Sequence, residues 1–244
     1  MRQEIERITS VKELPEINVG NTVGGCLTPD EFSHLARVAD ALWLHSGDPK
    51  DPHAELTSGK CSNGFVDTLR LLRFTNICEM AAESLVEQVI QKHSGFDGVD
   101  WVVGSDHAGA AFSHAVAAWM GAQHDFTEKG PGKSQEWNRF AIQPDEVVLQ
   151  VEELITTTGT LQAVRSGIRQ GTPTPVQFVP FVATLVHRSK SYEFEGNPIL
   201  YFVHYDIEVW EPSECPLCAA GSERLRPKQN WRELTAGRQM GLGL

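Results

Sequence analysis

Three things are scarce in this 244-residue sequence: cysteine, long apolar runs and positive charge. Its five cysteines are odd in number and scattered, which fits reduced thiols better than a disulfide framework. No apolar run approaches bilayer length, and the charged first residues, 1–7, contain no apolar signal region. The net charge of -11 argues against a general binder of nucleic acid or membrane surfaces. We therefore expect a cytoplasmic protein with neither kind of partner.

The composition is otherwise that of a globular protein. Hydrophobic residues make up 41% of the chain and charged residues 22%, which are ordinary values. The length is sufficient for one domain with a sizeable core and a small subdomain. The sequence contains no internal repeat and no low-complexity segment.

The stretch from Glu146 to Thr160 has the clearest functional pattern. Its apolar, β-branched run, 147–151, predicts a buried parallel strand. Glu152 and Glu153 follow, and then a hydroxyl-rich turn that leads into a helical pattern ending near Gly171. Ligands of open α/β sheets bind at the carboxyl ends of strands, often with a phosphate on the next helix. The carboxylates suit sugar hydroxyls or a divalent cation.

Residues 152–160 resemble the phosphoribosyl-pyrophosphate (PRPP) motif of type I phosphoribosyltransferases, which has two acids, two apolar residues and a Thr/Gly-rich loop. The resemblance implies that Glu152 and Glu153 face the ribose hydroxyls and contribute to a Mg²⁺ site held mainly through PRPP. It also implies a PRPP-binding role for the loop that follows, Thr156, Thr157, Thr158, Gly159 and Thr160. The alternative is an ordinary strand-to-helix turn capped by threonine.

Two further segments resemble the orotate members of that family. Residues 54–67 predict a hairpin with a Ser-Gly-Lys turn, and the resemblance implies that Thr57, Ser58 and Lys60 meet the base. A plain hairpin turn is the alternative. Arg188 follows an apolar strand and would grip the carboxylate of the base with its planar fork, unless it forms only a rim ion pair.

The pyrophosphate is assigned to two other loops by the same resemblance. A core strand over 98–103 leads into a glycine-bounded turn that suits an anion: Ser105, Asp106, His107, Ala108 and Gly109. A strand over 122–127 leads into a flexible loop with Lys129 and Lys133, which with Glu153 are the candidate catalytic residues. A structural loop histidine and a solvated lysine are the alternatives at His107 and Lys133.

Several positions depart from the family pattern. Glu153 adds a methylene to the acidic pair, and Thr158 replaces a loop glycine. Glu128 and Ala108 stand where arginine and lysine are usual, and the flexible loop has no histidine. Fewer cations around an anionic leaving group should weaken catalysis.

The implied fold is a mainly parallel α/β sheet flanked by helices, with a small hood. The expected divisions are an N-terminal extension (1–27), one phosphoribosyltransferase-like domain (28–222) and a C-terminal tail (223–244). Within the domain, about 68–188 form the core, and about 46–67 and 189–222 form the hood. The implied reaction is phosphoribosyl transfer from PRPP to a nucleobase, orotate being favoured, with Mg²⁺ as cofactor, pyrophosphate as product and a homodimer as the active form. The alternatives are a different base and a catalytically weak PRPP- or nucleotide-binding regulator.

Other segments carry secondary-structure patterns. Thr28, with a proline and two acids after it, predicts a helix that continues to about residue 45. A long helix is expected over 68–93, and a strand over 137–142. Apolar strands are expected over 176–186 and 198–210, and a poorly ordered tail after about residue 225.

Cys215 and Cys218 form a Cys-Pro-Leu-Cys segment with three interpretations. A structural zinc site needs four ligands, and the sequence marks no other cysteine or histidine to complete one. A redox pair should lie between a strand and a helix, whereas this segment follows a strand among prolines. The third interpretation, a structural turn, is the one the sequence favours.

Overall fold

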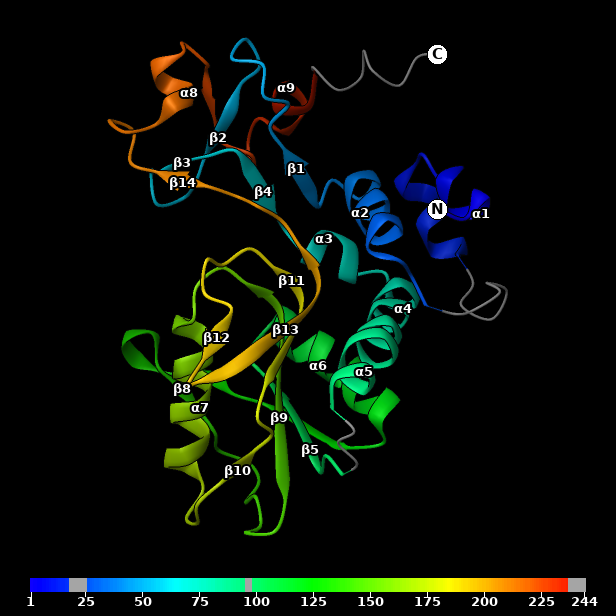
Figure 1. Ribbon diagram of the computed structural model, residues 1–244, viewed down its shortest axis with the longest axis vertical. Coiled ribbons are helices and arrows are strands. Elements are labelled where there is room, and N and C mark those ends of the chain that lie inside the picture. Colours follow the sequence, from blue (N-terminus) through cyan, green and yellow to red (C-terminus); the bar gives the residue numbers. More distant parts are fainter. Residues whose placement is uncertain (18–25, 95–97, 237–244) are drawn as a thin grey trace.

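The computed structural model describes residues 1–17, 26–94 and 98–236. In Figure 1 an α/β body occupies the lower half and a smaller, β-rich part the upper half. The N-terminal helices lie beside the junction between them. No helix in the described ranges combines the length and the apolar character needed to cross a membrane.

The body is built on a seven-stranded, mainly parallel sheet with the order β12-β13-β11-β9-β5-β6, and β10 also pairs with β9. Its strands are β5 (Trp101–Gly104), β6 (Gln123–Phe126), β9 (Val147–Ile155), β10 (Gln177–Phe178), β11 (Val182–His187), β12 (Glu193–Phe194) and β13 (Asn197–His204). Only the edge strand β12 pairs antiparallel with its neighbour in this sheet. This confirms the predicted fold class.

Helices cover both faces of the sheet. α4 (Thr75–Leu85) and α6 (Ala108–Met120) pack on one face, and α7 (Gly159–Gly171) lies on the other (Figure 1). The central strands β9 and β11 are apolar along most of their length because both of their faces are buried, as parallel strands require. The sheet is therefore buried between helices, and its strand ends position the loops that follow them.

The N-terminal part begins with α1 (Gln3–Glu6), η1 (Val11–Glu16) and α2 (Pro29–Val38). Ile5 and Leu14 are buried in the main core, so the described part of the expected extension packs on the body. The expected helix start at Thr28 is confirmed, with a capping box to Glu31. The helix ends earlier than expected because Asp40 adopts a left-handed conformation (φ 57°), which closes a Schellman-type stop.

The residues expected to prolong that helix form a strand instead. β1 (Leu42–Leu44) pairs antiparallel with β4 (Gly64–Val66). The long helix expected over 68–93 is confirmed in outline, with a break after its first turn and a π-helical stretch. Its parts are α3 (Leu69–Leu72), α4, η3 (Val86–Ile90) and α5 (Gln91–Ser94).

Three expected strands are corrected. Residues 137–142 form no strand; the pairing lies just before them, between β7 (Glu128–Lys129) and β8 (Gln135–Glu136), around the short η4 (Pro131–Lys133). Trp137 and Ile142 are buried as loop side chains, which explains the misleading apolar pattern. The strands expected over 176–186 and 198–210 are each split into two separate strands, β10 and β11 in the first, β13 and β14 in the second.

The upper part contains a four-stranded sheet, here called the hood sheet, with the order β14-β3-β2-β15. Its strands are β2 (His53–Glu55), β3 (Cys61–Ser62), β14 (Val209–Trp210) and β15 (Arg224–Leu225). The predicted hairpin at 54–67 supplies β2 and β3. Two short helices, α8 (Pro216–Ala219) and α9 (Trp231–Thr235), accompany the hood sheet (Figure 1).

The expected boundaries of the hood and tail need correction. β12 and β13 pair within the main sheet, although they fall inside the range expected for the hood. β15 and α9 lie beyond residue 222, and Leu234 on α9 is buried against Trp43 and Ala54. The hood therefore continues to at least residue 235, and the rest of the expected tail, 237–244, lies outside the described residues.

Candidate active site

Four of the predicted site segments meet at one edge of the main sheet. The turn 105–109 follows β5, Thr127–Lys129 follow β6, the loop 156–160 follows β9, and Arg188 follows β11. These strands are parallel, so their carboxyl ends lie at the same edge. The topology thus brings together segments that are up to about 80 residues apart in the sequence.

The two glutamates lie inside β9, which extends to Ile155, rather than just after it. Glu152 is 2% exposed and accepts a hydrogen bond of 2.6 Å from the Ser105 hydroxyl. Its other carboxyl oxygen, Oε1, is buried without a hydrogen-bond partner among the described residues. An unpaired buried carboxyl oxygen is costly, so this atom is poised for a ligand.

Burial controls the charge of this acidic pair. It raises the pKa of Glu152, and the adjacent Glu153 carboxylate raises it further. Burial also raises the pKa of Glu153, with a contribution from Asp106. A cation or a set of hydroxyl donors would reverse both effects by stabilising the ionised forms.

Gly109 permits the close approach between the turn and the acidic pair. A Cβ atom at this position would lie 2.5 Å from the Ser105 hydroxyl and 3.0 Å from Glu152 Oε2. Any larger residue at this position would push the 105–109 turn away from the acidic pair on β9. The need for glycine at position 109 of the predicted pyrophosphate loop is therefore steric.

Asp106 links that turn to the hairpin of the expected flexible loop. Its carboxylate accepts hydrogen bonds from Gln135 Nε2 at 3.0 Å and from His107, and it pairs with Lys129 Nζ at 3.0 Å. Burial alone would raise the pKa of Asp106, but these hydrogen bonds hold it below its ordinary value. Lys129 is thus brought to the predicted pyrophosphate loop, while Lys133 is exposed at the tip of its hairpin.

His107 has a strained backbone at the start of α6. Its φ of 60° and ψ of -108° lie outside the regions that a non-glycine residue readily adopts. Such strain is concentrated at ligand-binding segments, where the surroundings enforce it. Its side chain is 72% exposed, so the imidazole is directed mostly to solvent.

The phosphate loop leads into an open helix N-terminus. Thr156, Thr157 and Thr160 are exposed, and Thr158 is the N-cap residue of α7 without a side-chain cap. The first backbone N–H groups of α7 are therefore available to an anion. Thr158 has φ -78°, so its backbone does not require the glycine that is usual here.

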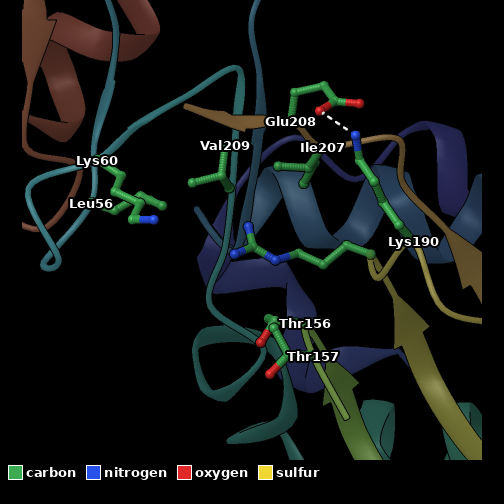
Figure 2. A pocket seen from close by; sticks show the side chains of 9 residues that line it. Leu56, Lys60, Thr156, Thr157, Lys190, Ile207, Glu208 and Val209 are labelled. Atoms are coloured by element: carbon green, nitrogen blue, oxygen red, sulfur yellow. Dashed lines mark hydrogen bonds and ion pairs between the residues drawn. The ribbon is translucent and has the colours of Figure 1, made fainter. Parts of the chain in front are cut away.

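A cleft of about 380 Å³ lies between the body and the hood (Figure 2). Its volume lies in the range of small-molecule sites. The lining comes from the body (Thr156, Thr157, Arg188, Lys190) and from the hood side (Leu56, Lys60, Ile207, Glu208, Val209). The predicted phosphate loop, base-side arginine and hairpin lysine therefore share one cavity.

Arg188 has no hydrogen bond or ion pair from its guanidinium to any described residue, and burial lowers its pKa. The other two cations of the cleft are paired: Lys60 with Glu211 at 2.7 Å and Lys190 with Glu208 at 2.8 Å. An anionic ligand would therefore find its free partner in Arg188. The expected base contacts Thr57 and Ser58 lie exposed at the hairpin tip and do not line the cleft.

The sequence reasoning missed Lys190, Ile207 and Glu208. Lys190 lies two residues after Arg188, and a second cation so near the strand end was the available signal. Glu208 reaches the cleft from the link between β13 and β14. Nothing in its local sequence marks that position.

An edge of parallel strands carrying an acidic pair, an open helix N-terminus and an anion-binding turn defines a protein of the type I phosphoribosyltransferase class. The crystal structure of orotate phosphoribosyltransferase from Aeropyrum pernix is similar in fold, with a TM-score of 0.53 at 17% identity. The similarity covers 71% of this chain and 93% of that one. No protein-family model matches the chain.

Sequence comparison narrows the class. The chain is 30% identical over 201 residues to orotate phosphoribosyltransferase of Heliobacterium modesticaldum, covering 82% of this chain and 98% of that protein. It is also 30% identical over 186 residues to that of Desulforamulus reducens, covering 76% and 93%. The chain belongs to the orotate phosphoribosyltransferase family.

Proposed function

We propose that this protein transfers the ribose 5-phosphate group of PRPP to a ring nitrogen of orotate and releases pyrophosphate, a step of pyrimidine nucleotide biosynthesis. The observation that carries the proposal is the single cleft that unites Thr156 and Thr157 of the phosphate loop with the unpaired Arg188. A phosphorylated sugar and a carboxylated base need these two features close together.

The sugar phosphate would bind at the carboxyl edge of the main sheet. The hydroxyls of the 156–160 loop and the N–H groups at the start of α7 would hold the 5-phosphate. Glu152 and Glu153 would accept hydrogen bonds from the ribose hydroxyls. The unpartnered Oε1 of Glu152 supports this role because a ligand hydroxyl would satisfy it.

The donor set also fits Mg²⁺ bound to PRPP. Oxygen ligands suit this ion, and it usually reaches proteins through one or two carboxylates, several waters and the phosphates of the substrate. Glu152 and Glu153 would supply the carboxylates, directly or through water, and the unsatisfied Glu152 oxygen supports the fit. When bound, the ion would offset the negative charge of the leaving pyrophosphate.

The leaving group would lie between the 105–109 turn and the β7–β8 hairpin. Cleavage of the bond to the pyrophosphate gives an oxocarbenium-like sugar, as in glycoside cleavage. Backbone N–H groups of the turn, Lys129 and Lys133 would stabilise the departing anion, and the carboxylate of Glu153 would stabilise the cationic ribose. Lys129 would exchange its contact with Asp106 for one with the pyrophosphate.

The base would occupy the cleft beneath the hood sheet. The Arg188 guanidinium can donate two parallel hydrogen bonds to the orotate carboxylate. Lys60 and Leu56 of the hairpin would face the ring from the hood side, while Thr57 and Ser58 stay at the exposed hairpin tip. A base without a carboxylate would leave Arg188 unpaired, which favours orotate over other bases.

We also propose that the protein acts as a cytoplasmic homodimer, by resemblance to its family. Light scattering after size exclusion would then give twice the chain mass of 27.0 kDa. A value equal to one chain at the concentration used for turnover would contradict the dimer.

One observation favours a catalytically weak, PRPP-binding regulator as the second candidate. Lys129 is held by Asp106, and the remaining loop cation, Lys133, is exposed at a hairpin tip. The leaving group then has few free cations nearby, which reduces transition-state stabilisation.

The deciding experiment combines calorimetric PRPP binding with pyrophosphate release, in the presence of Mg²⁺ and either orotate or other bases. Release with orotate supports the enzyme proposed here. Release with a different base alone would reject orotate, and tight binding without any release would leave the regulator. If the protein showed no PRPP binding and no pyrophosphate release, both the enzyme and the regulator would be rejected.

A further inference from the structure

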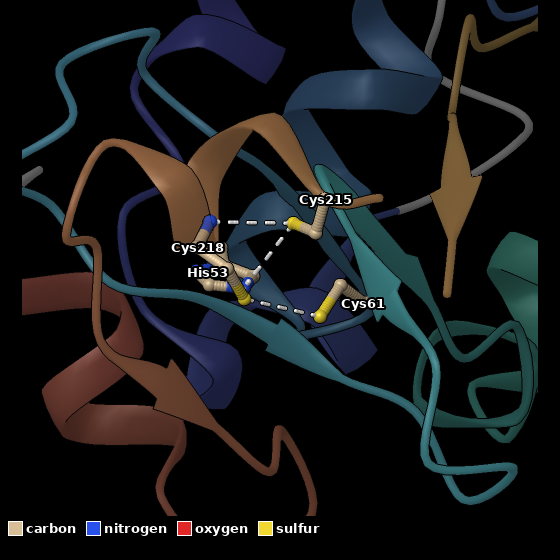
Figure 3. Close-up of side chains that lie close together, drawn as sticks. All are labelled: His53, Cys61, Cys215 and Cys218. Atoms are coloured by element: carbon tan, nitrogen blue, oxygen red, sulfur yellow. Dashed lines mark hydrogen bonds between the residues drawn. The ribbon is translucent and has the colours of Figure 1, made fainter. Parts of the chain in front are cut away.

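The hood contains a cluster of three cysteines and one histidine that the active site does not use (Figure 3). It joins Cys215 and Cys218 around α8 to Cys61 on β3 and His53 on β2. Their ligand atoms all lie within 4.8 Å of one another. The two residues that the sequence did not pair with Cys215 and Cys218 therefore come from the neighbouring hood strands.

The spacing of these atoms is that of a tetrahedral zinc site. Sulfur and nitrogen ligands at ordinary zinc distances lie about 3.8 Å apart for S···S and about 3.6 Å for S···N. In this chain Cys61 Sγ and Cys218 Sγ are 3.6 Å apart. His53 Nε2 lies 3.7 Å from Cys215 Sγ and 3.4 Å from Cys218 Sγ. A disulfide would require about 2.05 Å between sulfurs, so the cysteines are free thiols spaced as ligands.

The histidine is oriented as a ligand by a second hydrogen bond. His53 Nδ1 lies 2.8 Å from the Ser222 hydroxyl, which in turn donates to the carbonyl of Asp51 at 2.7 Å. Because that hydroxyl proton is already committed, Nδ1 is the donor to Ser222. Nε2 then carries the lone pair, directed at the thiols. Metal-bound histidines commonly have such a partner on their other nitrogen.

The sulfur of Cys215 also has a backbone donor beside it. The backbone N–H of Cys218 donates to Cys215 Sγ at 3.4 Å, across the turn that begins α8. His53 and Cys61 are 0% exposed, Cys215 is 2% exposed and Cys218 is partly buried, so most of the cluster is shielded from water. Four protein donors that face one another fit a structural metal rather than a catalytic one, which keeps an open position.

We propose that His53, Cys61, Cys215 and Cys218 bind one structural Zn²⁺ that fastens the C-terminal segment to the hood hairpin. Zinc is preferred because a tetrahedral site of three thiolates and one imidazole matches its chemistry. On binding, the three thiols release their protons to solvent and no redox change occurs.

The hood has short strands and a small apolar core, so a bound metal would add to its stability. Its sheet consists of strands of two or three residues. Among the described residues its apolar cluster has three buried members, Trp43, Ala54 and Leu234, with the partly buried Phe65, Leu225 and Trp231 packed against them. Small units with little core commonly depend on a metal or disulfides for stability. Cys61 directly follows Lys60 of the cleft, so the metal would also fix the base side of the active site.

The test is elemental analysis of the full chain, expressed in zinc-supplemented medium and purified without a metal-binding tag. About one zinc per chain is expected after gel filtration with a chelator in the buffer. Cys215→Ser and His53→Gln should lose most of it. Cys26→Ser, which changes a cysteine outside the cluster, should keep it.

A second measurement on the unaltered chain covers variants that fail to fold. A mercurial reagent should release zinc in proportion to the modification of three thiols. Once an excess of a competing thiol has freed the cysteines and been removed, added Co²⁺ should produce the visible absorption of a tetrahedral thiolate site. Trace zinc with no uptake of Co²⁺ would overturn the proposal. So would a Cys61–Cys218 disulfide in peptide maps, or iron in place of zinc. None of these readouts requires turnover, so they are independent of the proposed activity.

Discussion

Replacing Arg188 by alanine should separate base binding from PRPP binding. The guanidinium has no hydrogen bond or ion pair to any described residue, so the substitution breaks no polar contact among them and should change the melting temperature little. A hydrogen bond to a charged group contributes roughly 1.5–3 kcal/mol. Two such bonds at the lower end, in a cleft open to water, give about 3 kcal/mol, or roughly a 100-fold weaker orotate Kd.

The assay is calorimetric titration of orotate and, separately, of PRPP with Mg²⁺. Arg188→Lys keeps the charge but not the planar fork, so we expect about a tenfold loss of orotate affinity. Arg169→Ala is the matched control, because Arg169 of α7 pairs with Glu195, between β12 and β13, and does not line the cleft. Uracil, which lacks the carboxylate, should bind equally weakly to the original chain and to Arg188→Ala.

Two outcomes would refute this reasoning. An equal loss of orotate and PRPP affinity would mean that Arg188 supports the site as a whole rather than reading the base. Unchanged orotate affinity would mean that the carboxylate binds elsewhere, with Lys60 or Lys190 as the next candidates because both line the same cleft.

Three other predictions concern the phosphate loop, the acidic pair and the hood. Thr160→Val should weaken PRPP binding by about tenfold through the loss of one charge-assisted hydrogen bond, while Thr235→Val, far from the loop, should not. Equal PRPP affinities of Thr160→Val and the original chain in calorimetry would reject the role of Thr160. Burial raises the pKa of Glu152 in the folded protein above its value in the unfolded chain. The ligand-free protein should therefore lose stability as pH rises from the lower of these two pKa values toward the higher one. Glu152→Gln should therefore raise the melting temperature at pH 8 and flatten its fall above pH 5, and an unchanged pH profile would contradict this. Leu234→Ala should cost about 2–5 kcal/mol by chemical denaturation because the side chain is buried in the hood, and a neutral effect would mean that α9 is not part of it.

The sequence was informative where chemistry is local. The acids of β9 and the threonines before α7 are contiguous, and each predicted loop follows a recognisable strand. Since parallel strand ends share an edge, the convergence of these loops followed from the strand order. The helix start at Thr28 was equally local, as its capping box spans only four residues.

The failures arose where the signal is distributed or ambiguous. Leu42 and Trp43 fit a helical period, but the helix stops before them and they form β1. The stop is made by Asp40 in the left-handed conformation, where a glycine would have been a clearer signal in the sequence. Trp137 and Ile142 are loop residues with buried side chains, so apolar spacing appeared without strand pairing. Periodicity reports burial, and it does not by itself report hydrogen bonding between strands.

The cysteine cluster shows the same limit for a binding site. Cys215 and Cys218 were visible as a pair, whereas His53 and Cys61 lie more than 150 residues earlier and are separated from each other by a hairpin turn. Only the pairing of β2 with β3, and of these strands with β15 and β14, brings the four side chains together. A sequence without its strand register cannot supply that information.

Turnover by the full chain tests the central claim most directly. Orotate, PRPP and Mg²⁺ are mixed with the protein, and loss of orotate absorbance is followed together with pyrophosphate release. We expect both to change at equal molar rates, and Arg188→Ala to lower the rate at limiting orotate but much less at limiting PRPP. Pyrophosphate release without consumption of orotate, or no release at any orotate concentration, would contradict it.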